Sequence, residues 1–278
     1  MAQRAWEEAN GSLTISWNGE PWRLGFEADR LGLCRLTESG AGEALLSLQG
    51  LGMVGRCDLT ALGPDSLVQL EVVRNHARAT FTPQGWGGLQ VRASWTPTED
   101  SEGIELEIQA TASSLNELKR LEVYVGSTLT ATGRPDMVIT EVESRDARAA
   151  GLTYDGREPM ELLQGLVTHP IPESPDVIKL PIFMKHEGSQ TSSCYVELIH
   201  PHDVARRIST HDHDESSSNG EGPLFIRSVR HGFFGLDLEK GVVLRGRIQG
   251  HWFPASTVDD CAIAAMEQFL SEPLPLGN

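Results

Sequence analysis

The sequence has little positive charge and no long hydrophobic run. Only 23 lysines and arginines stand against 39 aspartates and glutamates in 278 residues, so the formal net charge is −16. A surface this acidic repels phosphate groups, and no basic stripe offsets it, so we expect no binding to nucleic acid or to anionic membranes. No stretch of about 18 apolar residues is present, which argues against a membrane-spanning helix.

Cysteine is scarce, and several familiar motifs are missing. Cys34, Cys57, Cys194 and Cys261 lie far apart without C-x-x-C spacing, so a zinc knuckle or a thioredoxin-type site is not expected. The first residues, MAQRAWEEANGS, lack an apolar secretory segment, so we expect free, mostly buried thiols and a cytoplasmic location. The motifs of P-loop NTPases, Rossmann dehydrogenases, zincin proteases and α/β-hydrolases are absent, which disfavours these classes.

The sequence does contain many short runs in which apolar and polar residues alternate, as in half-buried antiparallel strands. The runs at 13–17 and 22–26 flank Asn18-Gly19, a dipeptide typical of a hairpin turn. Further strands are predicted at 31–36, 67–74, 77–83, 88–96, 103–113, 119–128, 179–184, 192–199, 223–229, 231–237 and 241–249.

The long predicted strands indicate an all-β fold. Those at 88–96 and 103–113 each present one apolar row, and covering that row requires a second sheet. We therefore predict a large antiparallel β-sandwich that forms a single domain over residues 1–278. A helix is predicted only at about 257–271, and 212–222 is predicted to be a solvated loop.

Histidine is unevenly distributed, since eight of the nine histidines fall between His169 and His251. Two H-x-H pairs occur, His200 with His202 and His211 with His213. On a strand, residues i and i+2 face the same way, so either pair could place two imidazoles on one ion or one substrate. A cupin-type metal site would also need a glutamate at 204–207, where the sequence has none.

Other candidate residues lie near the predicted strand ends. Glu239 begins the turn Glu239-Lys240-Gly241, and its carboxylate is a candidate base. Arg245 and Arg247 alternate on one strand, so both would point to one face and could hold carboxylates or sugar hydroxyls. Trp86 and Trp252 are expected beside a cleft, where an indole ring can stack on a sugar.

The strand order, together with WTPTEDSEGIELEIQATA at 95–112, resembles the β-supersandwich of the galactose mutarotase-like superfamily. This resemblance implies a broad concave sheet that binds a carbohydrate, with histidines and a carboxylate transferring protons. Aldose epimerases carry an Asn-His motif after the strand that corresponds to 103–113. Here that place reads SLNELKR at 114–120, so one of the two expected catalytic histidines has no counterpart.

We therefore predict a carbohydrate-binding β-supersandwich protein in which acid–base chemistry would serve an isomerase, epimerase or lyase reaction. The predicted catalytic residues are His169, His186, His200, His202 and Glu239, and the predicted substrate-binding residues are Trp86, Arg245, Arg247 and Trp252. Two alternatives remain open: a metal-dependent, cupin-like enzyme that uses the H-x-H pairs, and a non-catalytic interaction module. Apart from that divalent metal no cofactor is expected; the expected partner is a small carbohydrate, and the expected state is a monomer or small homo-oligomer.

Overall fold

The protein is described by a computed structural model. The described residues are 5–9, 12–17, 19–27, 30–36, 42–53, 60–98, 103–113, 118–132, 166–170, 182–186, 193–200, 203–214 and 224–272.

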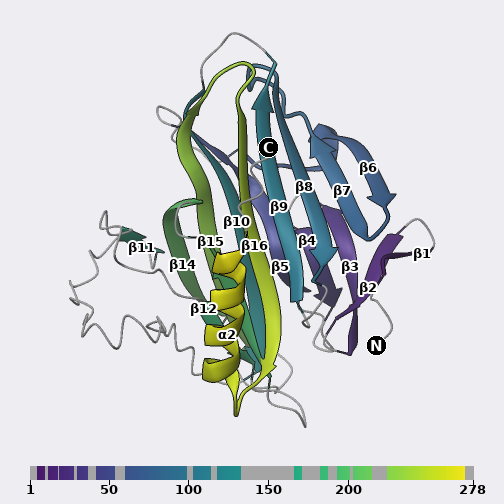
Figure 1. Ribbon diagram of the computed structural model, residues 1–278, viewed down its shortest axis with the longest axis vertical. Helices are drawn as coiled ribbons and strands as arrows, with labels where there is room; N and C mark the ends of the chain where they lie inside the picture. The colour runs from purple at the N-terminus through teal and green to yellow at the C-terminus, as the bar shows by residue number, and fades with distance from the viewer. Residues whose placement is uncertain are drawn as a thin grey trace.

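Two antiparallel sheets form the fold (Figure 1). The nine-stranded sheet contains, in spatial order, β1 (Glu7–Ala9), β2 (Ser12–Trp17), β3 (Glu20–Glu27), β4 (Arg30–Leu36), β5 (Gly42–Gly52), β10 (Leu118–Thr132), β15 (Leu224–Leu238), β14 (Val204–Asp214) and β11 (Leu166–Pro170). The seven-stranded sheet contains β12 (Ile182–His186), β13 (Ser193–Ile199), β16 (Val243–Pro254), β9 (Gly103–Ala112), β8 (Leu89–Pro97), β7 (His76–Phe81) and β6 (Leu67–Val73).

The two sheets pack face to face, as the alternating rows predict. Inward side chains such as Val91, Leu106 and Val123 are fully buried in one continuous hydrophobic core. The Trp95 indole of β8 donates a hydrogen bond to the Leu46 carbonyl of β5 at 3.0 Å, so this tryptophan also links the sheets through a polar contact. The predicted all-β sandwich is therefore confirmed.

The helix α2 (Val258–Ser271) lies on the outer face of the seven-stranded sheet, in front of β16 in Figure 1. Its apolar side packs on β13 in a second, smaller core that includes Val196, Leu198, Met266 and Phe269. The predicted helix is confirmed within one residue at its start. Among the described residues, no helix is long and apolar enough to cross a membrane.

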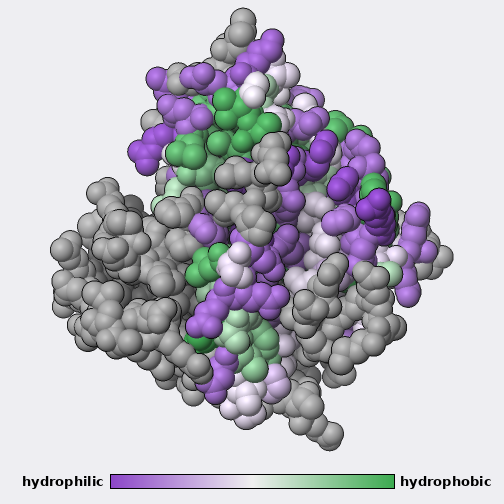
Figure 2. Space-filling view, viewed as in Figure 1, coloured by the Kyte–Doolittle hydropathy of each residue, from purple (hydrophilic) through white to green (hydrophobic). Residues whose placement is uncertain are grey.

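The same face appears in Figure 2, where hydrophilic residues cover much of the surface around the helix. Hydrophobic residues gather near the top, where the β15–β16 hairpin ends, and this hairpin exposes Leu236, Val242 and Val243. The edge strand β6 also exposes Val68 and Leu70. Polar residues therefore dominate this face around the helix, with apolar exposure near its margins.

Most predicted strands are present, with corrections. β1, β5, β11 and β14 were not predicted, and β14 includes His213, which the sequence assigned to the loop at 212–222. The two strands predicted at 223–229 and 231–237 are one continuous strand, β15, that runs through Arg230. The predicted first hairpin is confirmed, since Trp17 pairs with Glu20.

The cysteines agree with the prediction where the structure describes them. Cys34 and Cys194 are buried, Cys261 is half-buried, and no disulfide joins any two of these described cysteines. Cys57 lies outside the described residues.

Candidate functional site

Polar side chains lie on the outer face of the nine-stranded sheet, across its adjacent strands β5, β10 and β15. Because Val123 is buried toward the other sheet, its neighbours Glu122 and Tyr124 project from the opposite face. In register, Tyr124 lies between two glycines, Gly50 of β5 and Gly232 of β15. The sheet surface on both sides of the tyrosine therefore carries no side chain of its own.

Two more glycines allow neighbouring side chains to lie close to the sheet. A Cβ atom added at Gly52 would lie 2.9 Å from the Tyr124 ring. One added at Gly126 would overlap the Val229 carbonyl oxygen and lie 2.8 Å from the amide nitrogen of Gln49. The Tyr124 ring and the Gln49 amide therefore lie over glycines, where a side chain would not fit.

Four residues make up what we call the outer cluster: Gln49, Glu122, Tyr124 and Arg230. The Tyr124 hydroxyl donates a short hydrogen bond to the Glu122 carboxylate, and Arg230 Nε donates one to Gln49 Oε1 at 2.5 Å. Glu122 and Tyr124 are 3% and 6% exposed, whereas Gln49 and Arg230 are half-buried. The cluster thus combines a carboxylate, a phenol, an amide and a guanidinium on one face.

Arg230 is the cationic group of the outer cluster. Burial lowers the pKa of its guanidinium below the ordinary value, and an interaction with Tyr124 partly opposes this shift. In the part of the chain that the structure describes, Arg230 forms no ion pair, and its hydrogen bond to Gln49 uses only Nε. The Nη nitrogens therefore retain their donor capacity.

A second polar group, the inter-sheet network, lies between the sheets and consists of Ser127, Tyr195, Glu197 and His231. Ser127 Oγ and the Tyr195 hydroxyl both donate to Glu197 Oε1, the latter at 3.2 Å, and His231 Nε2 lies 2.8 Å from Glu197 Oε2. Ser127 also accepts the Leu46 backbone N–H at 3.0 Å. Burial, and then the Glu197 charge, raises the pKa of Tyr195 well above its ordinary value.

All four side chains of the inter-sheet network are 0% exposed. A serine, a histidine and a carboxylate in contact suggest nucleophilic catalysis, but such chemistry requires access for a substrate. Here the carboxylate receives hydrogen bonds from both sheets inside the core. The arrangement supports a role in holding the sheets together.

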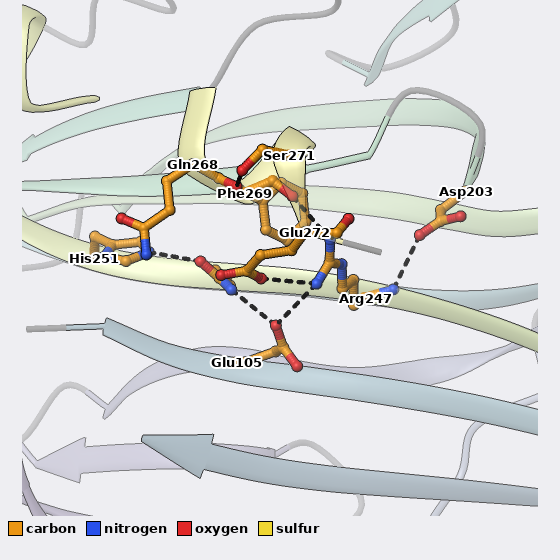
Figure 3. Close-up of polar contacts among 9 residues, drawn as sticks. Glu105, Asp203, Arg247, His251, Gln268, Phe269, Ser271 and Glu272 are labelled. Atoms are coloured by element: carbon orange, nitrogen blue, oxygen red, sulfur yellow. Dashed lines mark hydrogen bonds and ion pairs between the residues drawn. The ribbon is translucent and has the colours of Figure 1, made fainter. Parts of the chain in front are cut away.

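A third group, the helix cluster, lies beneath α2 and contains Glu105, Arg247, Gln249, His251 and Glu272 (Figure 3). Arg247 Nη1 donates to Glu272 Oε2 at 2.9 Å and lies 3.8 Å from Glu105 Oε2. Gln249 joins Glu105 to His251 through hydrogen bonds of 2.8 Å and 3.1 Å. Burial lowers the pKa of His251 to about 4 and raises that of Glu105. These contacts attach the helix to the sheet.

The predicted catalytic residues are spread over several elements. His169 lies on β11 at the edge of the nine-stranded sheet, and His186 lies on β12 at the edge of the other sheet. His200 follows β13 and is half-buried, and Glu239 is exposed in the β15–β16 turn. His202 lies outside the described residues. The structure therefore places His169 and His186 in different sheets, and the catalytic roles of all five residues stay predictions.

The predicted substrate-binding residues need corrections in position. Trp86 and Trp252 were expected at a cleft but are 1% and 4% exposed, because both indoles fill the core. Trp252, for example, packs edge-on against Trp17 at 6.2 Å between ring centroids. Arg247 is buried and engaged by the end of α2, whereas Arg245 is half-buried. Both indoles therefore lie in the hydrophobic core and not, as the sequence predicted, beside a cleft.

Metal ligands do not gather in the described ranges, where no group of three histidine, cysteine or acidic side chains is placed to hold an ion. His211 and His213 are strand residues that pair with Arg227 and Phe225.

The sequence did not single out the outer cluster. Its alternation at 119–128 does place Glu122 and Tyr124 on the face opposite Val123, and this is the one local signal available. Gln49 lies on a strand that was not predicted, and Arg230 lies where two strands were predicted to meet. The cluster exists only because distant strands become neighbours.

Neither a known family model nor a curated protein matches this sequence. Among solved structures, a GalM/aldose epimerase homologue from C. elegans is 11% identical with a TM-score of 0.40, and the match covers 90% of this chain and 99% of that one. A mutant of the heparan sulfate lyase HepC from Pedobacter heparinus is 8% identical with a TM-score of 0.40, covering 90% of this chain and 37% of that one. The galactosidase domain of the alpha-galactosidase-sucrose kinase AgaSK is 11% identical with a TM-score of 0.35, covering 81% and 30%. The chain thus spans well under half of the last two proteins, and the similarity concerns the arrangement of strands alone.

Proposed function

We propose that the outer cluster binds a carbohydrate, and that Glu122 and Tyr124 exchange protons with it in an isomerase, epimerase or lyase reaction. The observation that supports this is the hydrogen-bonded pair of Glu122 and Tyr124 beside Arg230 and Gln49, on a sheet face lined by glycines.

The chemistry of the cluster suits a sugar. Sugar hydroxyls both donate and accept hydrogen bonds, and the cluster offers a carboxylate acceptor together with guanidinium and amide donors. The Tyr124 ring adds a flat apolar surface for the C–H groups of a sugar ring. Gly50 and Gly232, which pair with Tyr124 in register, add no side chain on either side of the ring.

The Glu122 and Tyr124 pair suits proton transfer. A carboxylate is a general base, a phenol is a general acid, and each group assists catalysis when it lies within hydrogen-bond reach of the substrate. Because the phenol already donates to the carboxylate, the pair can accept a proton at Glu122 and return one from Tyr124. Reactions that move a proton at a sugar carbon or hydroxyl need both steps.

The histidines predicted from the sequence remain part of the proposal as further acid–base groups. His169 belongs to the same sheet as the outer cluster, two strands from β15, and pairs in register with Arg207. His186, His200 and His202 are alternatives for the same role, with Glu239 as a second carboxylate.

Calorimetric titration with neutral sugars and uronic acids tests the proposal. We expect the protein to bind at least one of them at millimolar concentrations, and Glu122→Gln to weaken that binding about tenfold, because one charged acceptor is lost. Tyr124→Phe should keep the ring and much of the binding while abolishing proton exchange with the sugar. NMR in deuterated water measures that exchange. Glu20→Gln, an exposed change on β3 of the same sheet, is the matched control.

Two results would overturn the proposal. The first is the absence of binding to every sugar of the panel by the folded parent protein. The second is binding that Glu122→Gln and Glu20→Gln leave equally strong, because the ligand would then lie elsewhere.

A further inference from the structure

Arg230 differs from the other buried or half-buried arginines whose contacts are described. Arg35 donates to the Glu43 carboxylate at 2.7 Å, and Arg247 donates to the Glu272 carboxylate at 2.9 Å. Arg230 instead donates to the neutral amide oxygen of Gln49, and within the described residues it has no carboxylate partner. This occurs in a chain with 39 acidic residues, where a partner is easily supplied.

Leaving a half-buried guanidinium without a counter-ion costs free energy, because the charge loses part of its hydration. The same loss of hydration lowers the pKa of Arg230. A neutral partner at Nε fixes the orientation of the guanidinium plane but does not neutralise its charge. The two Nη nitrogens then present paired donors, the geometry that matches the two oxygens of a carboxylate.

The surroundings of Arg230 add further polar groups on the same face. Arg230 pairs in register with Gly126, and the next row outward along the strands pairs Thr128 with Ser228. The Thr128 hydroxyl donates to the Ser228 hydroxyl at 3.2 Å, and both residues are half-buried. On its other side along the strands lies Tyr124, whose interaction with Arg230 favours the guanidinium charge. An anion at Arg230 would thus be flanked by hydroxyl groups.

We propose that the ligand of the outer cluster is an acidic sugar whose carboxylate accepts two hydrogen bonds from the Nη nitrogens of Arg230. This inference rests on the proposed function and narrows its substrate class from carbohydrates to uronic acids or their oligomers. Arg230 acts as the specificity-determining residue, and Glu122 with Tyr124 contacts the remainder of the sugar.

The test compares matched pairs of ligands by calorimetry: glucuronate against glucose, and galacturonate against galactose. We expect at least one uronate to bind the parent protein about tenfold more tightly than its neutral partner, the gain typical of a paired charged hydrogen bond. Arg230→Gln should remove this preference, because it should weaken binding of the uronate more than binding of the matched neutral sugar, which loses only a donor to a hydroxyl. Arg230→Lys keeps the charge but loses the planar guanidinium with its paired donors, so this variant should retain only part of the preference for the uronate.

Arg92→Gln is the matched control, because Arg92 is exposed on β8 of the other sheet and its removal changes the net charge equally. Circular dichroism and thermal melts check that each variant is folded. If Arg230→Gln fails to fold, Gln49→Leu tests the same point, since a guanidinium that has lost its fixed orientation should also lose the uronate preference.

The outcomes separate this inference from the proposed function. Equal binding of uronates and neutral sugars, or a preference that Arg230→Gln does not change, overturns the assignment of Arg230 while carbohydrate binding stands. Tighter binding of glucose 6-phosphate than of glucuronate overturns the carboxylate as the anionic group. Absence of any sugar binding overturns both.

Discussion

His251 shows how burial controls the charge of a single residue. Its side chain is 2% exposed, stacks on Phe253 with 5.5 Å between ring centroids, and lies 3.1 Å from the amide oxygen of Gln249. A Cβ added at Gly103 would overlap the ring, so the ring fills the space above that glycine. The neutral ring fits this site, whereas a charged ring would be poorly hydrated.

We predict that acid weakens the fold through His251. Its pKa is about 4 in the folded protein, against an ordinary value of 6.5 for an exposed histidine. Between these pH values the histidine is therefore protonated in the unfolded chain and neutral in the folded protein. Stability is therefore full above pH 6.5 and falls as the pH drops toward 4, by up to about 3 kcal/mol from this residue. Urea unfolding across this range, compared between the parent and His251→Gln, should show a shallower fall in the variant.

The comparison between parent and variant also isolates His251 from Glu105. Burial raises the pKa of Glu105, so its contribution runs in the opposite direction, and stability from this carboxyl rises as it takes up a proton in acid. His76→Gln is the control for removing a histidine, because His76 is half-buried and should change the slope less. Equal slopes in the parent and His251→Gln would refute the prediction.

Single residues were predictable in part, as β13 shows. Alternation separates its two faces, and an apolar face such as that of Val196 and Leu198 is the one expected to point into the core. In the structure both faces are buried, those two residues under α2 and Tyr195 with Glu197 between the sheets. The sequence therefore indicates which residues share a face, but not which partner covers each face.

At the scale of elements, Arg247 joins α2 to the sheet. Besides its contact with Glu272, its Nη2 donates to the Phe269 carbonyl at 2.8 Å, and its guanidinium lies 4.4 Å from the centroid of the Phe269 ring. The bond to Phe269 satisfies a backbone carbonyl in the last turn of the helix, where carbonyls lack a partner within the helix. One side chain thus anchors the last turn of α2.

We predict that Arg247→Met loosens the end of α2. The loss of charged hydrogen bonds and of the cation–π contact should lower the free energy of unfolding by about 1–3 kcal/mol. Hydrogen exchange followed by mass spectrometry should show faster exchange within 258–272 than in the parent. Arg92→Met, on an exposed position of β8, should change neither quantity. Unchanged exchange in Arg247→Met would mean that the apolar contacts alone hold the helix.

The elements that the sequence predicted are those with clear local signals. Apolar and polar residues alternate strictly in β8 and β9, and the two strands pair as expected, with Leu89 opposite Ala112 at one end. β5 was missed because the residues that pair with Glu122 and Tyr124 are Gly52 and Gly50, which provide no polar alternation. β14 was missed because its end is polar and merges with a loop-like sequence. Local pattern fails where a strand carries glycine or where both of its faces are polar.

For the whole molecule, the order of strands decides where the outer cluster forms. β10 lies between β5 and β15, so Gln49, Glu122 and Arg230 meet although they are far apart in the sequence. Hydrophobic alternation contains no information about which distant strands pair, so the cluster was beyond prediction from one sequence. The class of the fold was predictable, because each long strand presents one apolar row and a second sheet is needed to cover it.

The inter-sheet network connects the two sheets through the core, and we predict that it stabilises the whole fold. Glu197→Gln should lower the free energy of unfolding by about 3 kcal/mol, because it removes a buried charged acceptor from Ser127, Tyr195 and His231. His231→Gln should have a similar effect. The double variant should lose at least about 1 kcal/mol less than the sum of both, since the two residues contact each other. Urea unfolding at neutral pH measures all four proteins, and Gln90→Ala on the exposed face of β8 is the control. Strictly additive losses would show that Glu197 and His231 stabilise the sheets independently, and the hydrogen bond between them would then contribute nothing to holding the sandwich together.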